Sequence, residues 1–195
     1  MILRTIYLYL HYIIAKIKYY DRVKFRGFAI VCARTGAKIS FIGGGNCKTM
    51  INSHFASNML GLYQRTYIYA EKGGQITIGR GCGISGATIN AIDEITIGDY
   101  VRIGANCIIM DNDSHPLNKS RMYPTLPGDI KHRPIRIGDE CFIGANSIIL
   151  KGTTIGHNCV VGAGSVVSGS FPDNVIIAGN PAKIVKENKI AFRYE

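Results

Sequence analysis

Aliphatic residues recur at every sixth position through the second half of the chain. The first run holds Ile97, Ile103 and Ile109, and Ile78 and Ile84 extend it backward one residue out of phase. The second run contains Ile137, Ile143, Ile149, Ile155, Val161 and Val167. A helix repeats about every 3.6 residues and a single strand about every two, so neither explains this spacing. A period of six predicts a parallel β-helix built from hexapeptide repeats.

Glycine and other small residues occupy the positions after these aliphatic residues. Glycine follows directly at Gly79, Gly98, Gly104, Gly138, Gly144, Gly156 and Gly162. Each hexapeptide can then form one short flat face and one corner, so that three of them close a triangular coil of about 18 residues. The aliphatic side chain points into the coil, and the small residues let the corner turn without steric conflict. Residues 36–77 keep this period poorly, and we expect two or three less regular coils there.

The N-terminal segment, residues 1–26, follows a different period. Its apolar residues fall at spacings of three and four, namely Leu3, Ile6, Leu10, Ile13 and Ile17. This spacing predicts an amphipathic helix. Arg4, Lys16 and Lys18 make it a poor membrane-spanning segment, because one central charge costs about 2.5–3.5 kcal/mol on insertion scales. The helix therefore either lies on an anionic membrane surface or packs against the rest of its own oligomer.

The net charge of +10 is concentrated near the N-terminus. Residues 1–26 contain six lysines and arginines and one acidic residue, Asp21. No base-reading motif accompanies this charge, so we expect no nucleic-acid partner. The six cysteines are scattered without a CxxC pair, which is typical of a chain from a reducing compartment. The apolar N-terminus has no small-residue cleavage site, and we expect a cytoplasmic protein at the inner face of the membrane.

Several longer motifs lie within and after the repeats. They are ISGATI (84–89), IGANCIIMDNDSHP (103–116), RPIRIGDECFIGANSIILKGTTIG (133–156), VVGAGSVV (160–167) and AGNPAKIV (178–185). Together they resemble the hexapeptide-repeat acyltransferases, and within them the galactoside, maltose, xenobiotic and polysaccharide O-acetyltransferases. The resemblance covers about residues 75–186 and implies a left-handed β-helix, a homotrimer, and acetyl-CoA bound in a groove between two subunits. Phe142 departs from the family pattern, because many relatives have Trp there.

The segment DNDSHP interrupts the repeat and begins an inserted loop at 116–134. His115 in this segment matches the position of the catalytic base in the family. A histidine suits proton transfer near neutral pH. In an unbroken coil, however, His115 would follow Ile109 by six residues and point into the core. The break at Pro116 favours the catalytic interpretation over the core one.

Further residues are candidates for assisting the histidine or for binding the acceptor. Asp113 is the candidate catalytic partner of the histidine, and Asp111 is a candidate for contacting substrate hydroxyls. Both carboxylates are equally compatible with local turn hydrogen bonds. The resemblance places Ser85 and Asn90 near the acceptor pocket, and His132 closes the loop beside it.

The resemblance assigns cofactor contacts to the last coils. The assigned residues are Gly144, Ala145 and Ala163 along the pantetheine arm, Ser168 beyond them, and Lys183 and Lys186 at the CoA phosphates. Small side chains permit close approach of a ligand, although a corner of the coil requires them in any case. Lysines suit phosphate because each is a point charge on a flexible stem. Ser168 and Gly169 stand where many relatives have Thr and Lys, so the chain departs from the pattern there.

These features favour an acetyl-CoA-dependent O-acetyltransferase that modifies a sugar hydroxyl in surface-polysaccharide biosynthesis, on a small-molecule or lipid-linked acceptor. Two alternatives stay open, an N-acetyltransferase of an amino sugar and a non-catalytic hexapeptide scaffold. Zinc carbonic anhydrases need three converging histidines, and the spacing of His115, His132 and His157 provides no such triad, so we expect no metal. The expected parts are a basic amphipathic helix at 1–26, an acyltransferase β-helix at 27–180 with the loop 116–134, and a tail at 181–195.

Overall fold

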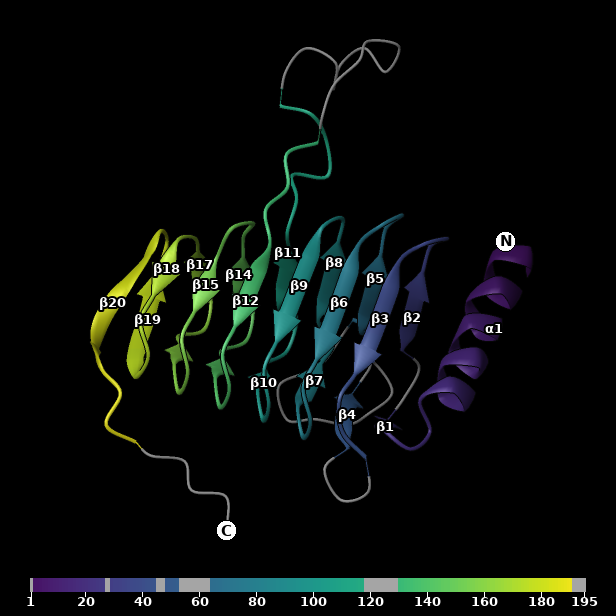
Figure 1. Cartoon of the computed structure of the whole chain (residues 1–195), viewed down its shortest axis with the longest axis horizontal. Coiled ribbons are helices and arrows are strands. Elements are labelled where there is room, and N and C mark those ends of the chain that lie inside the picture. Colours follow the sequence, from purple (N-terminus) through teal and green to yellow (C-terminus); the bar gives the residue numbers. More distant parts are fainter. Residues whose placement is uncertain (1, 27–28, 45–47, 53–63, 118–129, 191–195) are drawn as a thin grey trace.

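The computed structural model describes residues 2–26, 29–44, 48–52, 64–117 and 130–190. Within these residues the chain forms one helix, α1 (Ile2–Lys18), followed by twenty strands that wind into a prism (Figure 1). The predicted all-β, left-handed parallel β-helix is confirmed, since the strands pair in parallel from coil to coil. The helix is shorter than the predicted segment, because the chain enters the first strand at Val23.

Three sheets form the faces of the prism. The first face contains β1 (Val23–Arg26), β4 (Thr49–Asn52), β7 (Gly83–Ser85), β10 (Arg102–Ile103), β13 (Phe142–Ile143), β16 (Val160–Val161), β19 (Val175–Gly179) and the antiparallel β20 (Ala182–Glu187). The second face contains β2 (Ile30–Ala33), β5 (Tyr67–Ala70), β8 (Thr88–Ala91), β11 (Ile108–Met110), β14 (Ile148–Ile149) and β17 (Val166–Val167). The third face contains β3 (Lys38–Phe41), β6 (Gln75–Ile78), β9 (Glu94–Ile97), β12 (Ile135–Ile137), β15 (Thr154–Ile155) and β18 (Ser170–Phe171).

Each coil contributes one strand to every face. The first two coils, β1 to β3 and β4 to β6, make up the less regular sequence before residue 79. The register pairs Ile84 with Ile103 and, further along, Ile143 with Val161. The coil between Ile84 and Ile103 is one residue longer than the coil between Ile143 and Val161. This extra residue explains the change of phase in the aliphatic repeat.

The inward aliphatic side chains stack in columns from coil to coil. On the second face the column holds Val31, Ile68, Ile89, Ile109, Ile149 and Val167. All of them except Val31 are fully buried, with 0% exposure. Burial of each such side chain contributes about 1.5–3 kcal/mol relative to leaving it in water. The columns also fix the register, because a shift of one residue would turn every aliphatic side chain outward.

Glycine is required where neighbouring coils approach each other at the corners. A Cβ atom on Gly144 would lie 2.5 Å from the backbone nitrogen of Ala163 in the next coil. One on Gly104 would lie 2.7 Å from the backbone nitrogen of Ala145. Both distances are far inside van der Waals contact, so coil stacking by itself explains these two glycines.

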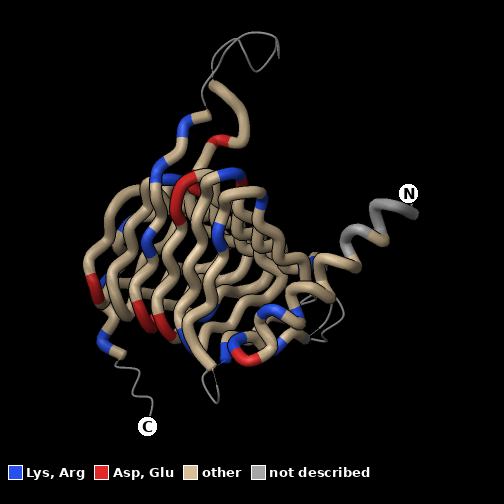
Figure 2. Tube along the Cα trace, turned by 45° about the vertical axis from the view of Figure 1, so that its right-hand side comes forward, with Lys and Arg blue, Asp and Glu red and all other residues tan. Residues whose placement is uncertain are grey.

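Helix α1 lies beside β2 at the N-terminal end of the prism (Figure 1). Ala15 and, just after the helix, Tyr19 are buried. The Tyr19 ring packs edge-on against Phe41 with 5.0 Å between centroids, and its hydroxyl donates to the Ile39 carbonyl at 3.1 Å. Lysine and arginine residues gather where the helix joins the first coil (Figure 2). No helix within the described residues is long and apolar enough to cross a membrane.

Candidate active site

The inserted loop leaves the fourth coil at the corner between the second and third faces, here called the loop corner (Figure 1). Its two ends form a short antiparallel stem, in which Asn112 and His132 make a β-bridge. The Asp113 N–H extends the stem by donating to the Lys131 carbonyl at 3.1 Å. Residues 118–129 of the predicted loop lie outside the described part of the chain. The stem fixes where the DNDSHP segment stands on the prism.

His115 is exposed to solvent on this stem, so its interpretation as a core residue is wrong. The physical reason is that the chain turns out of the coil immediately after Asp111. The His115 N–H donates to the Asp113 carbonyl at 2.7 Å, and Ser114 between them has a φ of 60°. Ordinary coil corners such as Asn106 and Asn146 also have a φ of 60°, so the turn itself, and not its φ, sets His115 outside the coil. Within the described residues, the His115 imidazole makes no hydrogen bond.

Asp111 faces the coil and not the loop. Its side chain is fully buried. Its Oδ1 accepts a hydrogen bond from the Ile92 N–H at 2.9 Å, and its Oδ2 accepts one from the Asp93 N–H at 2.8 Å. Asn112 Nδ2 also donates to Oδ1 at 2.9 Å. Asp111 therefore holds the corner of the preceding coil, which corrects the expectation that it contacts the substrate or makes only a local turn.

Asp113 forms an ion pair with Lys151, a residue that sequence reasoning missed. The two side chains are 15% and 27% exposed. The second carboxylate oxygen of Asp113 is buried and has no hydrogen-bond partner among the described residues. The register sets Ile149 against Ile109, and Lys151 consequently follows beside Asp111 at the base of the stem. The hexapeptide register is the signal by which sequence reasoning would find Lys151.

A pocket of about 380 Å³ opens beside the stem. It is lined by Glu71, Lys72, Asn90, Ile92, Asn112, Ser114 and Ile130. Asn90, predicted to bind the acceptor, accepts a hydrogen bond on Oδ1 from Asn112 Nδ2 at 2.9 Å. Glu71 and Lys72 belong to the irregular second coil, where the repeat gave no register to place them. The lining of the pocket includes Ser114, the residue directly before His115 in the sequence. The amide, hydroxyl and charged groups of the lining suit a polyhydroxylated ligand.

The other two predicted acceptor residues have different surroundings. His132 Nδ1 lies 3.1 Å from Asp93 Oδ2 at the loop corner, and its side chain is 47% exposed. Ser85 ends β7 on the first face and does not line the pocket. The structure therefore brings His132 to the site and leaves Ser85 outside it.

Four of the predicted cofactor residues form a row, here called the small-residue row. The corner between the first and second faces holds Gly144, Ala145 and Ala163. Lys183 continues the row, because it stands opposite Ala178, whose side chain lies beside Gly162. Gly144 is buried, whereas Ala163 and Lys183 are exposed. Small side chains with a cation at one end fit an elongated ligand that ends in phosphate.

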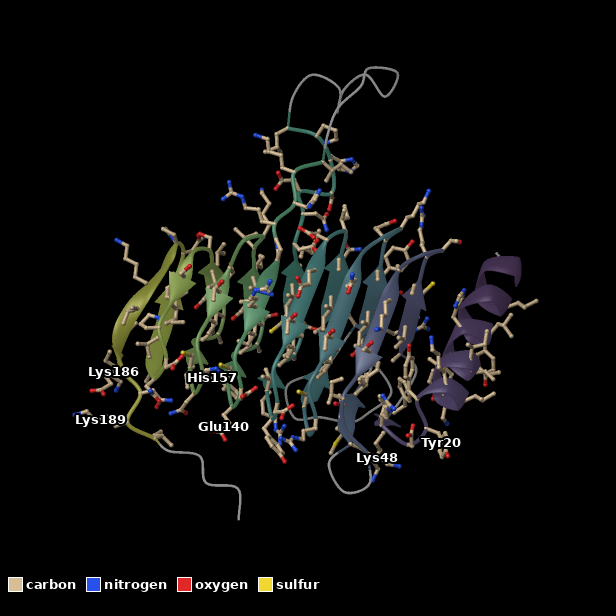
Figure 3. The ribbon with its side chains drawn as sticks, in the orientation of Figure 1. Tyr20, Lys48, Glu140, His157, Lys186 and Lys189 are labelled. Carbon is tan, nitrogen blue, oxygen red and sulfur yellow. The ribbon has the colours of Figure 1, made fainter. Side chains whose placement is uncertain are left out.

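Lys186 and Ser168 lie apart from this row. Lys186 stands opposite Ile176 towards the other end of β20. Figure 3 shows it with His157 along the lower edge of the prism, on the opposite side from the loop. Ser168 is exposed at the loop corner, between β17 and β18. Within one chain, these two residues therefore do not join the other predicted cofactor residues.

His157, Cys82 and Cys107 lie at coil corners. His157 Nδ1 accepts a hydrogen bond from the Asp139 N–H at 3.1 Å, between the third and first faces. Among the described residues, no group of three or more His, Cys, Asp or Glu side chains could hold a metal ion. Burial raises the pKa of Cys82 to about 12 and the pKa of Cys107 to about 11. Both thiols therefore stay protonated at neutral pH and are poor nucleophiles.

Comparisons with known proteins match the repeat and much of the chain. A family model described as the hexapeptide repeat of succinyl-transferase matches residues 94–110 and 134–168. The galactoside O-acetyltransferase of Escherichia coli K12 is 32% identical over 142 residues, which are 72% of this chain and 68% of that protein. The putative lipopolysaccharide biosynthesis O-acetyl transferase WbbJ of the same organism is 38% identical over 104 residues, which are 51% of this chain and 53% of that protein.

A solved structure shares the fold along most of the chain. The polySia specific acetyltransferase NeuO matches with a TM-score of 0.52 and 26% sequence identity, over 89% of this chain and 88% of that chain. The chain spans between 34% and 68% of the length of the curated relatives it matches. The similarity therefore extends to both the sequence and the fold of acetyltransferases.

Proposed function

This chain belongs to the hexapeptide-repeat acyltransferases, and from that premise we propose that it transfers an acetyl group from acetyl-CoA to a sugar hydroxyl. The observation that carries the proposal is the stem at the loop corner, which exposes His115 and places the preceding residue, Ser114, in the lining of a polar pocket. The names of the galactoside O-acetyltransferase, WbbJ and NeuO support acetyl as the transferred group. The name of WbbJ also favours a role in the synthesis of a surface polysaccharide.

In the proposed reaction, His115 is the general base. Its imidazole takes the proton from the acceptor hydroxyl as that oxygen bonds to the acetyl carbon, and gives the proton to the sulfur when the carbon–sulfur bond breaks. The thioester of acetyl-CoA supplies the acetyl group. Exposure of His115 on the stem supports this role, because a general base must reach the acceptor. Asp113, paired with Lys151, positions the turn that carries the histidine.

We place acetyl-CoA along the small-residue row, with Lys183 at its phosphates. Gly144 shapes the row by permitting close stacking of the coils, and it is too buried to touch a ligand. Within one chain the row and His115 lie at different corners of the prism. A homotrimer resolves this separation, because a ligand held between two neighbouring chains reaches the row of one and the loop corner of the other.

We place the acceptor on a lipid, at the inner face of a membrane, with residues 1–26 holding the enzyme there. The basic charge of this segment and the apolar side chains that α1 exposes support this setting. A lipid-linked sugar would then meet the enzyme by diffusion in two dimensions. The alternative is a free sugar acceptor, and detachment of the enzyme from the membrane would then leave the rate of acetyl transfer unchanged.

The test is an assay of acetyl transfer from acetyl-CoA to methyl β-galactoside, in which the rate is measured as the release of free CoA. His115→Ala should lower kcat by about 10²–10⁴-fold, because a general base contributes that much. His157→Ala is the matched control, since this histidine supports a corner on the far side of the prism from the loop. Its kcat should stay close to that of the wild type.

The same assay separates the two alternatives. An amine needs less help from a base than a hydroxyl, so a small effect of His115→Ala with glucosamine as acceptor would favour N-acetylation. Calorimetric titration with acetyl-CoA addresses the scaffold. Wild-type protein that neither binds acetyl-CoA nor releases CoA would be a scaffold and would end the proposal.

A further inference from the structure

Helix α1 and the turn after it direct one apolar face away from the β-helix. The exposed residues are Ile6, Tyr9, Leu10, Ile13, Ile14, Ile17 and Tyr20, each between 41% and 74% accessible to solvent. With about 3.6 residues per turn, they form one continuous stripe, here called the outer stripe. Ala15 and Tyr19 lie on the opposite side and are 2% and 8% exposed. The helix thus buries its narrower side in its own chain and leaves the broader apolar side uncovered, which monomeric soluble proteins rarely do.

Basic residues border the outer stripe. Lys16 and Lys18 are exposed and flank it on the two sides of the helix. Lys48 Nζ donates to the Tyr20 carbonyl at 3.1 Å and so adds a third cation at the end of the stripe (Figure 3). The first acidic residue of the chain is Asp21, whose carboxylate lies 3.7 Å from the Arg22 guanidinium. An apolar stripe bordered by lysines is the pattern of a helix that lies in the headgroup region of a bilayer.

The charges also decide between a lipid surface and a second copy of this chain. Two copies packed in parallel through their outer stripes would bring Lys16 and Lys18 of both helices together, and in either orientation the helices carry no acidic residue to pair with these lysines. Like charges held together in a contact oppose association. Anionic headgroups supply the missing negative charge, and Tyr9 and Tyr20 of the outer stripe suit the boundary between headgroups and acyl chains.

We propose that the outer stripe docks onto an anionic lipid bilayer, with α1 lying parallel to the membrane plane. The bilayer then faces the N-terminal end of the prism, where α1 lies beside the first strands (Figure 1). The outer stripe is thus the surface by which the enzyme would bind the membrane. The proposed function explains why such binding is useful, and the inference rests on it only in that respect. Binding to vesicles is measured without any acceptor, so docking and acetyl transfer succeed or fail separately.

The experiment is co-sedimentation of the full chain with vesicles. Binding should be strong to phosphatidylcholine mixed with phosphatidylglycerol, weak to phosphatidylcholine alone, and reduced by salt. Ile13→Ser/Ile17→Ser should lower the partition coefficient at least about tenfold, because two large apolar side chains are lost from the contact. Lys16→Gln/Lys18→Gln should lower it about fivefold for each lysine removed. Val185→Ser/Ile190→Ser, with equally exposed side chains at the other end of the prism, is the matched control and should bind like the wild type.

A second measurement uses the absence of tryptophan from the chain. Tyr9→Trp places the single tryptophan of the chain in the outer stripe, and the tryptophan emission should shift to shorter wavelength only with the anionic vesicles. The same binding to neutral and anionic vesicles would overturn the proposal, and so would unchanged binding of Ile13→Ser/Ile17→Ser. Sedimentation velocity without lipid tests the alternative that the outer stripe joins two copies of the chain. A smaller oligomer for Ile13→Ser/Ile17→Ser would make the outer stripe a contact between copies and would also overturn the proposal.

Discussion

Two corners of the prism are built from the same repeat and differ in what satisfies the backbone. At the corner of the small-residue row, the Gly144 N–H donates to the Val161 carbonyl of the next coil at 2.8 Å, so the stacked backbone pairs with itself. At the loop corner the chain departs, and the Asp111 carboxylate accepts the N–H groups of Ile92 and Asp93 instead. The closed corner of the small-residue row therefore constrains side-chain size, whereas the opened loop corner requires particular polar groups. The polar and charged residues of the candidate site gather where the coil opens.

The largest expected effect tests the contrast between the two corners by adding one methyl group at the closed corner. Gly144→Ala should lower the free energy of unfolding by about 3 kcal/mol, because its Cβ would meet backbone that cannot rotate away. Gly164→Ala is the matched control at the same corner of the next coil, where an added Cβ meets nothing within 4 Å. Its positive φ alone should cost about 1 kcal/mol. Equal losses in urea unfolding would contradict the importance of stacking.

The next largest effect belongs to the opened corner. Asp111→Ala should lower the free energy of unfolding by about 2–3 kcal/mol, because two part-buried N–H groups lose their acceptor. Asp113→Ala is the comparison at the same corner. It should cost less than about 1 kcal/mol in stability, since it loses one partly exposed ion pair, yet lower kcat about tenfold. Urea unfolding and the acetyl-transfer assay measure the two effects, and the reverse ranking in stability would refute the assigned roles.

The closed coils could be predicted from the sequence because their constraint is local. The 18-residue spacing of Ile149 and Val167 assigns both to one inward column, and the structure stacks them. Ile109 joins the same column across the inserted loop, where the spacing is interrupted. The loop corner could be predicted only in part. Whether the chain leaves the coil at Asp111 or at His115 depends on hydrogen bonds to another coil, and no local pattern reports them.

The N-terminal helix shows the same limit in a different form. The spacing that includes Ile6, Leu10 and Ile17 predicts a helix with an apolar stripe, and the structure contains both. The spacing does not say which side packs against the β-helix. Ala15 and Tyr19 decide this, because a small residue and a flat ring fit against the first coil. The larger aliphatic side chains remain outside.

A smaller effect concerns the cation at the opened corner. Lys151→Met should lower kcat about tenfold with little change in KM or in stability, because Lys151 holds Asp113 at the base of the catalytic turn. Lys151→Arg should restore most of the activity. Arg136→Met removes a similar ion pair on the third face, where Arg136 lies 3.1 Å from Glu94, and it is the matched control. If both Met variants had the same kcat, Lys151 would be one more surface cation.

The smallest effect extends the comparison to the third corner, between the third and first faces. Cys82 Sγ donates to the Gly98 carbonyl at 3.1 Å, and burial raises the pKa of this thiol from 9.0 to about 12. The unfolded chain therefore releases the proton above about pH 9 while the folded chain keeps it, so stability is complete below that pH and falls between there and about pH 12. The slope is at most about 1.4 kcal/mol per pH unit.

Cys82→Ala should remove this alkaline loss while costing some stability at every pH through the missing hydrogen bond and a small cavity. Urea unfolding at about pH 8 and about pH 10 measures it, since the stability difference between wild type and variant should shrink by about 1.4 kcal/mol between the two. If the stability difference shrinks, burial keeps the Cys82 thiol neutral, and the third corner then behaves like the closed corner of the small-residue row. A constant difference would mean that water reaches the thiol, as it reaches the groups at the loop corner, and the division between closed and opened corners would then fail at Cys82.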